Sequence, residues 1–451
     1  MTRPVSSGEA VFVSGSTLRH VAVMTATASV GLVAVFVVDL LSLLYVSRLG
    51  RPEATAGVGY ATIVLYIMVS FNVGLMIAVT ALTARALGAR DREGARRIAA
   101  SSLAVMTTGG LLLGLLMLPL LPWLLPLLGA RGEALAIATS FLWITLPANM
   151  VMALGMGLSG ILRAAGDARR AMYVTLAGAV VTAGLDPLLI FGAGLGPDGA
   201  AWATALSRIV FVVIGWHGVV RVHRLLTRPT LAALRQDLCP TAAIAAPAIM
   251  TNLANPLANA CFFAIIARFG DQVVAGSAIV DRLVPVAFGV LFALSGAIGP
   301  IIAQNWGAGR YDRMRRALTD AVCFVAIYVV VASLLLFLLR HQVPALFGAT
   351  GRTAELVTFF CLIAGPMWLF IGALFVATAA FNNLGMPLHA TALSWGRATL
   401  GTVPLAWLGA HLGGPEGAML GTVVGAVVAG SLALALAYRA IDRLARRASL
   451  A

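Results

Sequence analysis

Long apolar segments alternate with short polar links along the whole chain. Each apolar segment holds about 20 residues or more, which is the length that crosses the hydrocarbon core of a bilayer as an α-helix. Backbone groups in lipid must find hydrogen-bond partners within the protein, so only helices and closed β-barrels can span it. A barrel would show alternating segments of about ten residues. The pattern therefore predicts an all-α membrane protein.

Twelve transmembrane helices are predicted. They cover residues 20–46, 58–84, 98–121, 133–162, 171–193 and 199–220 in the first half, and 241–267, 273–304, 317–339, 354–380, 387–411 and 416–438 in the second half. The longest polar link separates the two halves. We therefore expect a cytoplasmic segment 1–19, a first lobe 20–220, a cytoplasmic linker 221–240, a second lobe 241–438 and a cytoplasmic tail 439–451.

The two halves repeat one another at an offset of roughly 219 residues. Three motifs recur in order and in equivalent links: Gly88-Ala89 with Arg96-Arg97 as Gly307-Ala308 with Arg315-Arg316, Arg48-Leu49-Gly50 as Arg268-Phe269-Gly270, and Gly196-Pro197-Asp198-Gly199-Ala200 as Gly414-Pro415-Glu416-Gly417-Ala418. Six spans per repeat is an even number, so the copies run parallel, related by an axis along the membrane normal. This arrangement is typical of two-lobed transporters with a cavity between the lobes.

Composition supports the membrane assignment and sets the orientation. Only 11% of the residues are charged, against about 25% in soluble domains. The net charge of +14 comes from arginines, and these cluster in short links between the apolar segments. Arginine-rich links face the cytoplasm, so we expect a multi-pass protein of the cell (inner or plasma) membrane with both termini cytoplasmic. The same clustering argues against nucleic-acid binding.

The chain resembles the multidrug and toxic compound extrusion (MATE) family. The residues that carry the resemblance are the stretch from Val38-Asp39 to Arg48-Leu49-Gly50, the segment Leu185-Asp186-Pro187-Leu188-Leu189-Ile190-Phe191-Gly192, and the loop Asn305-Trp306-Gly307-Ala308-Gly309-Arg310. The resemblance implies two lobes arranged in a V and export of amphipathic, often cationic, compounds in exchange for protons or sodium. The chain looks most similar to the DinF-like branch, whose coupling acids lie in the first lobe. The interiors of the seventh and tenth spans lack the carboxylates expected of the sodium-coupled branch, which favours protons.

Two acids inside the first lobe are the candidate coupling site. An ionisable residue inside a span is costly and is by default a functional hypothesis. Asp39 and Asp186 lie about 13 Å and 10 Å from the outer ends of their spans, by helical rise. Burial raises a carboxyl pKa, and a second carboxylate nearby raises it further, so such a pair can hold a proton. The alternative is that each acid only makes a polar contact between helices.

Other polar residues could complete or modify this site. Thr182, Thr204 and Asn149 are candidate neighbours of the acids, although packing is the commoner role of intramembrane threonine. Pro187 cannot donate to the carbonyl of Ala183, so we expect this turn to be open to bending. Four further charges are possible partners: Arg208, Asp281, Arg282 and Arg397. If Arg208 paired with an acid, it would lower that pKa and oppose proton storage.

Two other functions compete with export. A flippase for a lipid-linked precursor would need a strongly basic cavity, whereas the intramembrane arginines are balanced by three aspartates. An intramembrane enzyme would need a catalytic motif, and the sequence has neither HExxH nor GxSxG. The four cysteines show no metal-binding spacing. We therefore expect no metal and no cofactor other than the coupling ion, amphipathic small molecules and lipids as partners, and a monomer.

Overall fold

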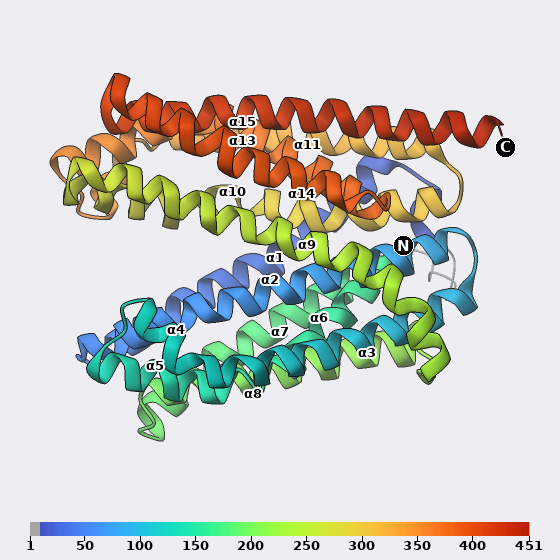
Figure 1. Cartoon of the computed structure of the whole chain (residues 1–451), viewed down its shortest axis with the longest axis horizontal. Helices are drawn as coiled ribbons and strands as arrows, with labels where there is room; N and C mark the ends of the chain where they lie inside the picture. Colours follow the sequence, from blue (N-terminus) through green and yellow to red (C-terminus); the bar gives the residue numbers. More distant parts are fainter. Residues whose placement is uncertain (1–9, 451) are drawn as a thin grey trace. The chain divides into compact units, whose positions relative to one another are not determined.

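The computed structural model describes residues 10–450, which fold into helices without a β-strand (Figure 1). The first half contains η1 (Val11–Val13), α1 (Thr17–Ser47), α2 (Pro52–Gly88), α3 (Arg92–Met117), η2 (Leu118–Leu120), α4 (Leu121–Leu127), α5 (Gly132–Thr145), α6 (Asn149–Ala164), α7 (Ala168–Pro187), η3 (Leu188–Gly192), α8 (Pro197–Trp216) and η4 (His217–Val222). The second half contains α9 (Leu231–Ile266), η5 (Ala267–Phe269), α10 (Asp271–Gly307), α11 (Tyr311–Leu338), α12 (Gln342–Leu346), α13 (Gly351–Asn383), α14 (Pro387–Gly396), η6 (Arg397–Thr402) and α15 (Val403–Leu450).

The helices match the twelve predicted spans. Ten described helices are long and apolar enough to cross a membrane, and an eleventh candidate is the pair α5 and α6, which meet at a 53° bend. The twelfth is hidden in α15, because the backbone leaves the helical region at Gly413 and Gly414. Gly414 has a φ of +65°, a value that a residue with a Cβ adopts only with strain. The predicted twelve-helix, two-repeat fold is confirmed.

The chain divides into two compact units, and two helices are shared between them. The first unit contains Thr27–Ile249, and the second contains Phe12–Ala26 together with the chain from Met250 onward. The amino-terminal end of α1 therefore belongs to the second unit, and that of α9 belongs to the first. Within the first unit α2 packs against α3, α5 and α6, while α13 packs against α10, α11 and α15 within the second.

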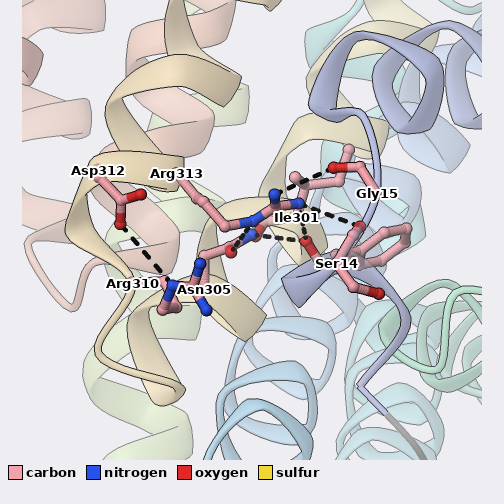
Figure 2. Close-up of polar contacts among 8 residues, drawn as sticks. Ser14, Gly15, Ile301, Asn305, Arg310, Asp312 and Arg313 are labelled. Carbon is pink, nitrogen blue, oxygen red and sulfur yellow. Dashed lines mark hydrogen bonds and ion pairs between the residues drawn. The ribbon is translucent and has the colours of Figure 1, made fainter.

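The amino-terminal segment of the second unit is bound through its backbone. Phe12 is 1% exposed, and its N–H donates to Gln304 Oε1 at 2.9 Å. Its carbonyl accepts from Asn305 Nδ2 at 3.1 Å and from Arg313 Nη2 at 2.9 Å. Arg313 also donates to the carbonyl of Ser14, and Figure 2 shows its guanidinium among these acceptors. The carboxyl-terminal end of α10 and the first turn of α11, on either side of the loop Ala308–Arg310, thus hold the segment that precedes α1.

Side chains also fix the amino-terminal ends of the two shared helices. Thr17, at the start of α1, donates to Asp320 of α11. In the first unit Asp237 of α9 forms an ion pair with Arg97 of α3 at 3.4 Å, and Thr241 of α9 lies 3.1 Å from Ser102 of α3. α3 and α11 are equivalent helices of the two repeats. α1 therefore begins against α11 of the second repeat, just as α9 begins against α3 of the first.

The last two spans pack through small residues. Gly417, Gly421 and Gly425 are spaced four residues apart, so they lie on one helix face. They face Gly409, Leu405 and Gly401 of the preceding span in antiparallel order. A Cβ built on Gly425 would lie 1.8 Å from the carbonyl oxygen of Gly401. Such close backbone approach is how membrane helices gain van der Waals contact without a hydrophobic driving force.

The loop between α6 and α7 contains a charged cap. Asp167 accepts the backbone N–H of Arg170 at 3.1 Å, the Arg170 guanidinium at 2.5 Å and a ring nitrogen of His223 at 2.8 Å. Burial by itself would raise the pKa of Asp167, but the hydrogen bonds from His223 and Arg170 and the charge of Arg170 lower this pKa to about 2. The carboxylate therefore stabilises the start of α7 through its charge as well as through capping.

We predict that Gly425→Val destabilises the protein, because the new side chain would meet the Gly401 backbone, which cannot move aside without separating the two helices. Overpacking of this kind costs about 1–3 kcal/mol, measurable as a lower Tm in detergent. The control is Val428→Leu, at a side chain that is 62% exposed, which should leave Tm unchanged. Equal Tm values for Gly425→Val and the parent protein would refute the packing.

We predict that Asp167→Asn destabilises the protein only where the carboxylate is charged in the folded state. The folded pKa lies below the unfolded value of about 3.9, so the charge contributes about 2 kcal/mol above pH 4. This contribution is lost as the pH falls toward 2. Asparagine keeps the helix cap, which isolates the charge. Tm measured from pH 7 to pH 2 should show a deficit that closes below pH 4; a deficit independent of pH would contradict the account.

Candidate functional site

One face of α1 brings the first candidate acid to the second. Asp39, Ser42 and Tyr45 are spaced three residues apart, so they lie on neighbouring turns of one face. Ser42 donates its hydroxyl hydrogen to Asp186 Oδ2 on α7. Tyr45 makes an edge-to-face contact with Phe191, with ring centroids 6.2 Å apart. The face of α1 that carries Asp39 is therefore the face that packs along α7 and η3.

The packing of α1 on α7 is close at its other end as well. A Cβ on Gly31 would lie 2.2 Å from Thr175 Oγ1. The contacts pair Gly31 with Thr175 and Ser42 with Asp186, so the two helices run parallel and in fixed register. This register explains why the two acids, distant in sequence, meet at the same level of the first unit.

The two carboxyl groups have different surroundings. Asp186 is completely buried, and its Oδ1 atom has no hydrogen-bond partner among the residues that the structure describes. Asp39 is exposed at the surface of α1. Because Ser42, one turn along α1 from Asp39, bonds to Asp186, the two carboxyl groups lie on adjacent turns of packed helices, where two negative charges would repel each other. A proton bound to either group would remove that repulsion and would supply Asp186 with a donor.

The backbone next to Asp186 is irregular, as the position of Pro187 predicts. The α-helix ends at Pro187 and continues as the π-helix η3. A π-helical turn is wider and less stable than an α-helical one, and such turns are frequent at functional sites. A Cβ on Gly199 of α8 would lie 2.7 Å from the backbone of Leu189. The widened turn is thus held by the close approach of α8.

The two candidate threonines do not bond to the acids in the described structure. Thr182 lies one turn before Asp186 and donates to the carbonyl of Gly178 in its own helix at 3.0 Å. Thr204 is half-buried on α8, and its carbonyl accepts from Ser207 at 2.9 Å. Their part in ion coupling stays a prediction.

Asn149 belongs to another polar cluster. It is 2% exposed at the start of α6. Its Nδ2 atom donates to the carbonyl of Gly110 on α3 at 2.9 Å, and its Oδ1 atom accepts from Asn72 Nδ2 on α2 at 2.8 Å. Together, these two hydrogen bonds of Asn149 connect α6 to α2 and α3. None of these contacts is with an acid, and the part of Asn149 in ion coupling stays a prediction.

Arg208 bonds to a backbone carbonyl and not to either acid. It is 7% exposed, and its Nη1 atom donates to the carbonyl of Thr145 at 3.1 Å. That carbonyl lies at the end of α5, where the chain bends into α6 and an α-helical bond is missing. No ion pair joins Arg208 to Asp39 or Asp186 in the described part of the chain. The arginine stabilises the bend.

Ser42 is a site residue that the sequence pattern did not predict. Its hydroxyl is the group that joins α1 to Asp186, and the spacing of Asp39 and Ser42 on one helix face was the available signal.

In the second unit Asp281 and Arg282 are both exposed on α10, and neither forms an ion pair with a described residue. Arg397 donates through Nη2 to Asn255 on α9.

Comparison with known proteins identifies relatives over nearly the whole chain. The MatE family model matches residues 28–188 and again 247–408, once in each repeat. The FAD transporter of Shewanella oneidensis is 29% identical over 419 residues, covering 91% of this chain and 92% of that protein. The multidrug export protein MepA of Staphylococcus aureus is 25% identical over 366 residues, covering 80% of each chain.

Solved structures show the same fold. The MATE transporter VcmN of Vibrio cholerae, in its bent form, superposes with a TM-score of 0.90 at 25% identity, covering 95% of this chain and 98% of that one. An outward-facing multidrug resistance MATE transporter superposes with a TM-score of 0.91 at 22% identity, covering 98% of this chain and all of that one.

We predict that Asn149→Ala lowers stability without abolishing transport by the folded protein. The substitution leaves Asn72 and the Gly110 carbonyl buried without this partner, which costs about 1–3 kcal/mol. Tm gives the first readout, and export per folded molecule in proteoliposomes gives the second. Asn72→Ala should add little to the Tm loss in the double variant, since both residues act through one contact. Loss of export at full stability would instead assign Asn149 to coupling.

Proposed function

The chain belongs to the MatE family, and on that premise we propose that it is a proton-driven antiporter exporting amphipathic, cationic small molecules by alternating access. Like its multidrug-exporting relatives, it is a multi-pass membrane transporter. It is not an enzyme. The finer assignment, in the DinF-like branch with both termini cytoplasmic and a monomeric protein, is part of the proposal. One observation carries it: the cluster of Asp39, Ser42 and Asp186 in the first unit.

The cluster supplies what proton coupling requires. Two carboxylates that repel each other favour binding one proton between them, since the shared proton relieves the repulsion. Asp39 is exposed and can exchange that proton, whereas Asp186 is buried and bonded to Ser42. Protonating Asp186 turns an acceptor-only group into one that also donates, so its bond to Ser42 must rearrange.

Rearrangement at this point can reach the helix packing. Ser42 lies on α1, and the carboxyl that it contacts lies one residue before Pro187 and the π-helix η3. A wide turn without the full set of α-helical bonds bends at lower cost than a regular helix. We infer that proton binding alters the packing of α1 on α7 and so changes access to the substrate cavity, with proton entry and substrate exit in opposite directions.

Sodium is the alternative coupling ion, and the polar residues of the second unit argue against it. A sodium site needs several oxygen ligands with carboxylates among them. In the second unit the interiors of α9 and α13 contribute asparagine and threonine, of which Asn383 is bonded within its own helix. The acids gather in the first unit instead.

A second substrate class is favoured by one relative. The FAD transporter of Shewanella oneidensis is similar over 91% of this chain, and its named substrate is a negatively charged dinucleotide. The second unit contains Arg397, a half-buried cation whose Nε atom is buried and which has no acidic partner among the described residues. Such a group suits an anion better than a cation. Phosphate-bearing amphipathic molecules are therefore the second candidate.

We predict that Asp39→Asn abolishes export driven by a pH gradient, because the amide cannot take up and release a proton. The assay is ethidium export by purified protein in proteoliposomes, with pH and sodium gradients imposed separately. The rate driven by the pH gradient should fall at least about tenfold, equivalent to 1.4 kcal/mol. Ser42→Ala should reduce it less, since the acids remain.

The matched control for this test is Glu53→Gln, which neutralises an exposed acid in the first turn of α2 and should transport normally. Retained pH-driven export by correctly inserted Asp39→Asn protein would overturn the proton site. Export by the parent protein under a sodium gradient alone would replace the proton with sodium.

A further inference from the structure

Arg397 is a half-buried charge inside a span of the second unit that the fold compensates only in part. Its Nη2 atom donates to Asn255 Oδ1. Its Nε atom is buried and has no hydrogen-bond partner among the described residues. No acidic side chain in the described part of the chain forms an ion pair with it, whereas Arg97, Arg315 and Arg352 each have one.

Keeping a guanidinium away from water with a single neutral partner is costly. A buried charge normally has an opposite charge and a hydrogen bond for each of its polar atoms. Arg208 meets this requirement in part by capping the end of α5. Arg397 caps no helix end, and the amide of Asn255 cannot neutralise it. A charge left in this state inside a span indicates a ligand of opposite charge.

The backbone around Arg397 is built to hold it. Arg397 is the first residue of the π-helix η6, and Thr402 donates its hydroxyl hydrogen to the Arg397 carbonyl at 2.9 Å, which stabilises the wide turn. Two residues earlier, Trp395 donates its indole N–H to the carbonyl of Met250 at 2.9 Å. Trp395 also packs against Ala254 and Ala258 of α9. The helix that carries Arg397 is thus fixed against the helix that carries Asn255.

The remaining polar atoms of this pair are all donors. Asn255 Oδ1 accepts from Arg397, which leaves the amide N–H groups of Asn255 and the Nε–H of Arg397, and neither group bonds to a described residue. A convergent set of N–H donors with a positive charge is the chemistry that binds a phosphate or carboxylate. Arginine is the residue best suited to that task.

The duplicated halves differ at this point. Counting by the offset of roughly 220 residues that relates Arg48 to Arg268, Asp39 of α1 corresponds to Asn259 of α9, one turn beyond Asn255. The same span therefore carries an acid in the first repeat and amides in the second, beside a cation. The two copies of this span therefore differ in the charge that they carry.

We propose that Arg397 and Asn255 form an anion-binding subsite that receives the phosphate or carboxylate group of a transported amphipathic molecule. The proposal rests on the exporter function proposed above and deepens its second substrate class, phosphate-bearing amphipathic molecules. Trp395 lies beside the subsite on the chain and is half-buried, so an aromatic ring joined to the anionic group has part of an apolar surface next to it.

Binding of FAD and riboflavin to purified protein tests the subsite directly. The two molecules share the flavin ring, but only FAD bears phosphates. FAD should raise Tm more than riboflavin does, and Arg397→Gln should remove that difference. Arg397→Lys should keep part of it, since the charge remains while the planar donor set is lost. The control is Arg268→Gln, an exposed arginine outside the spans, which should keep the full difference.

Transport separates this proposal from the proton mechanism. In proteoliposomes Arg397→Gln should raise the KM for FAD about tenfold or more while ethidium export under a pH gradient persists. Asp39→Asn should abolish both. If the parent protein does not distinguish FAD from riboflavin in binding, or if Arg397→Gln loses FAD and ethidium export equally, the subsite is wrong and the proton mechanism stands. If ethidium export fails in the parent protein, the proton mechanism is wrong, and the binding assay still decides the subsite.

Discussion

The cost of keeping a charged side chain away from water governs the interior of both units. Three buried or partly buried charges meet this cost differently. Arg208 bonds a carbonyl left free at the bend between α5 and α6, so its charge serves the fold. Among the described residues, the Asp186 carboxylate has one side-chain partner, Ser42, and a second oxygen without one. Within the same part of the chain, the Arg397 guanidinium is bonded only to the amide of Asn255. Asp186 and Arg397 are the two incompletely compensated charges. An ion or ligand bound there gains most, since it supplies the hydrogen bonds or opposite charge that the fold lacks.

Helix irregularities coincide with the two incompletely compensated charges. The π-helix η3 begins two residues after Asp186, and η6 begins at Arg397. Elsewhere the helices pack through close backbone contacts, as at Gly417, Gly421 and Gly425. Close packing resists deformation, whereas a π-helical turn lies near an alternative α-helical arrangement. Among the described residues, two of the three π-helical segments thus lie beside charges that the fold compensates only in part.

Each of the two shared helices, α1 and α9, runs from one unit into the other. The carboxyl-terminal part of α1 carries Asp39 and Ser42 in the first unit. In the second unit Asp320 accepts from Thr17 at the start of α1, and Asn305 and Arg313 bind the segment that precedes it (Figure 2). The division of α1 falls before Thr27, and that of α9 falls just after Pro247, the residue that the repeat aligns with Thr27. A change at Asp39 therefore acts on a helix that is anchored at both ends.

Local patterns in the sequence determined the twelve spans, the duplication and the two intramembrane acids, because apolar length, arginine clustering and motif spacing are properties of the chain itself. They also located the irregular turn at Pro187. Only the tertiary structure decided which side chains meet. Ser42 became the partner of Asp186, Asn149 joined Asn72, and Arg208 bonded the end of α5. These choices depend on the rotation and register of one helix against another, and many weak side-chain contacts distributed over distant segments fix that register, so no single stretch of sequence encodes it.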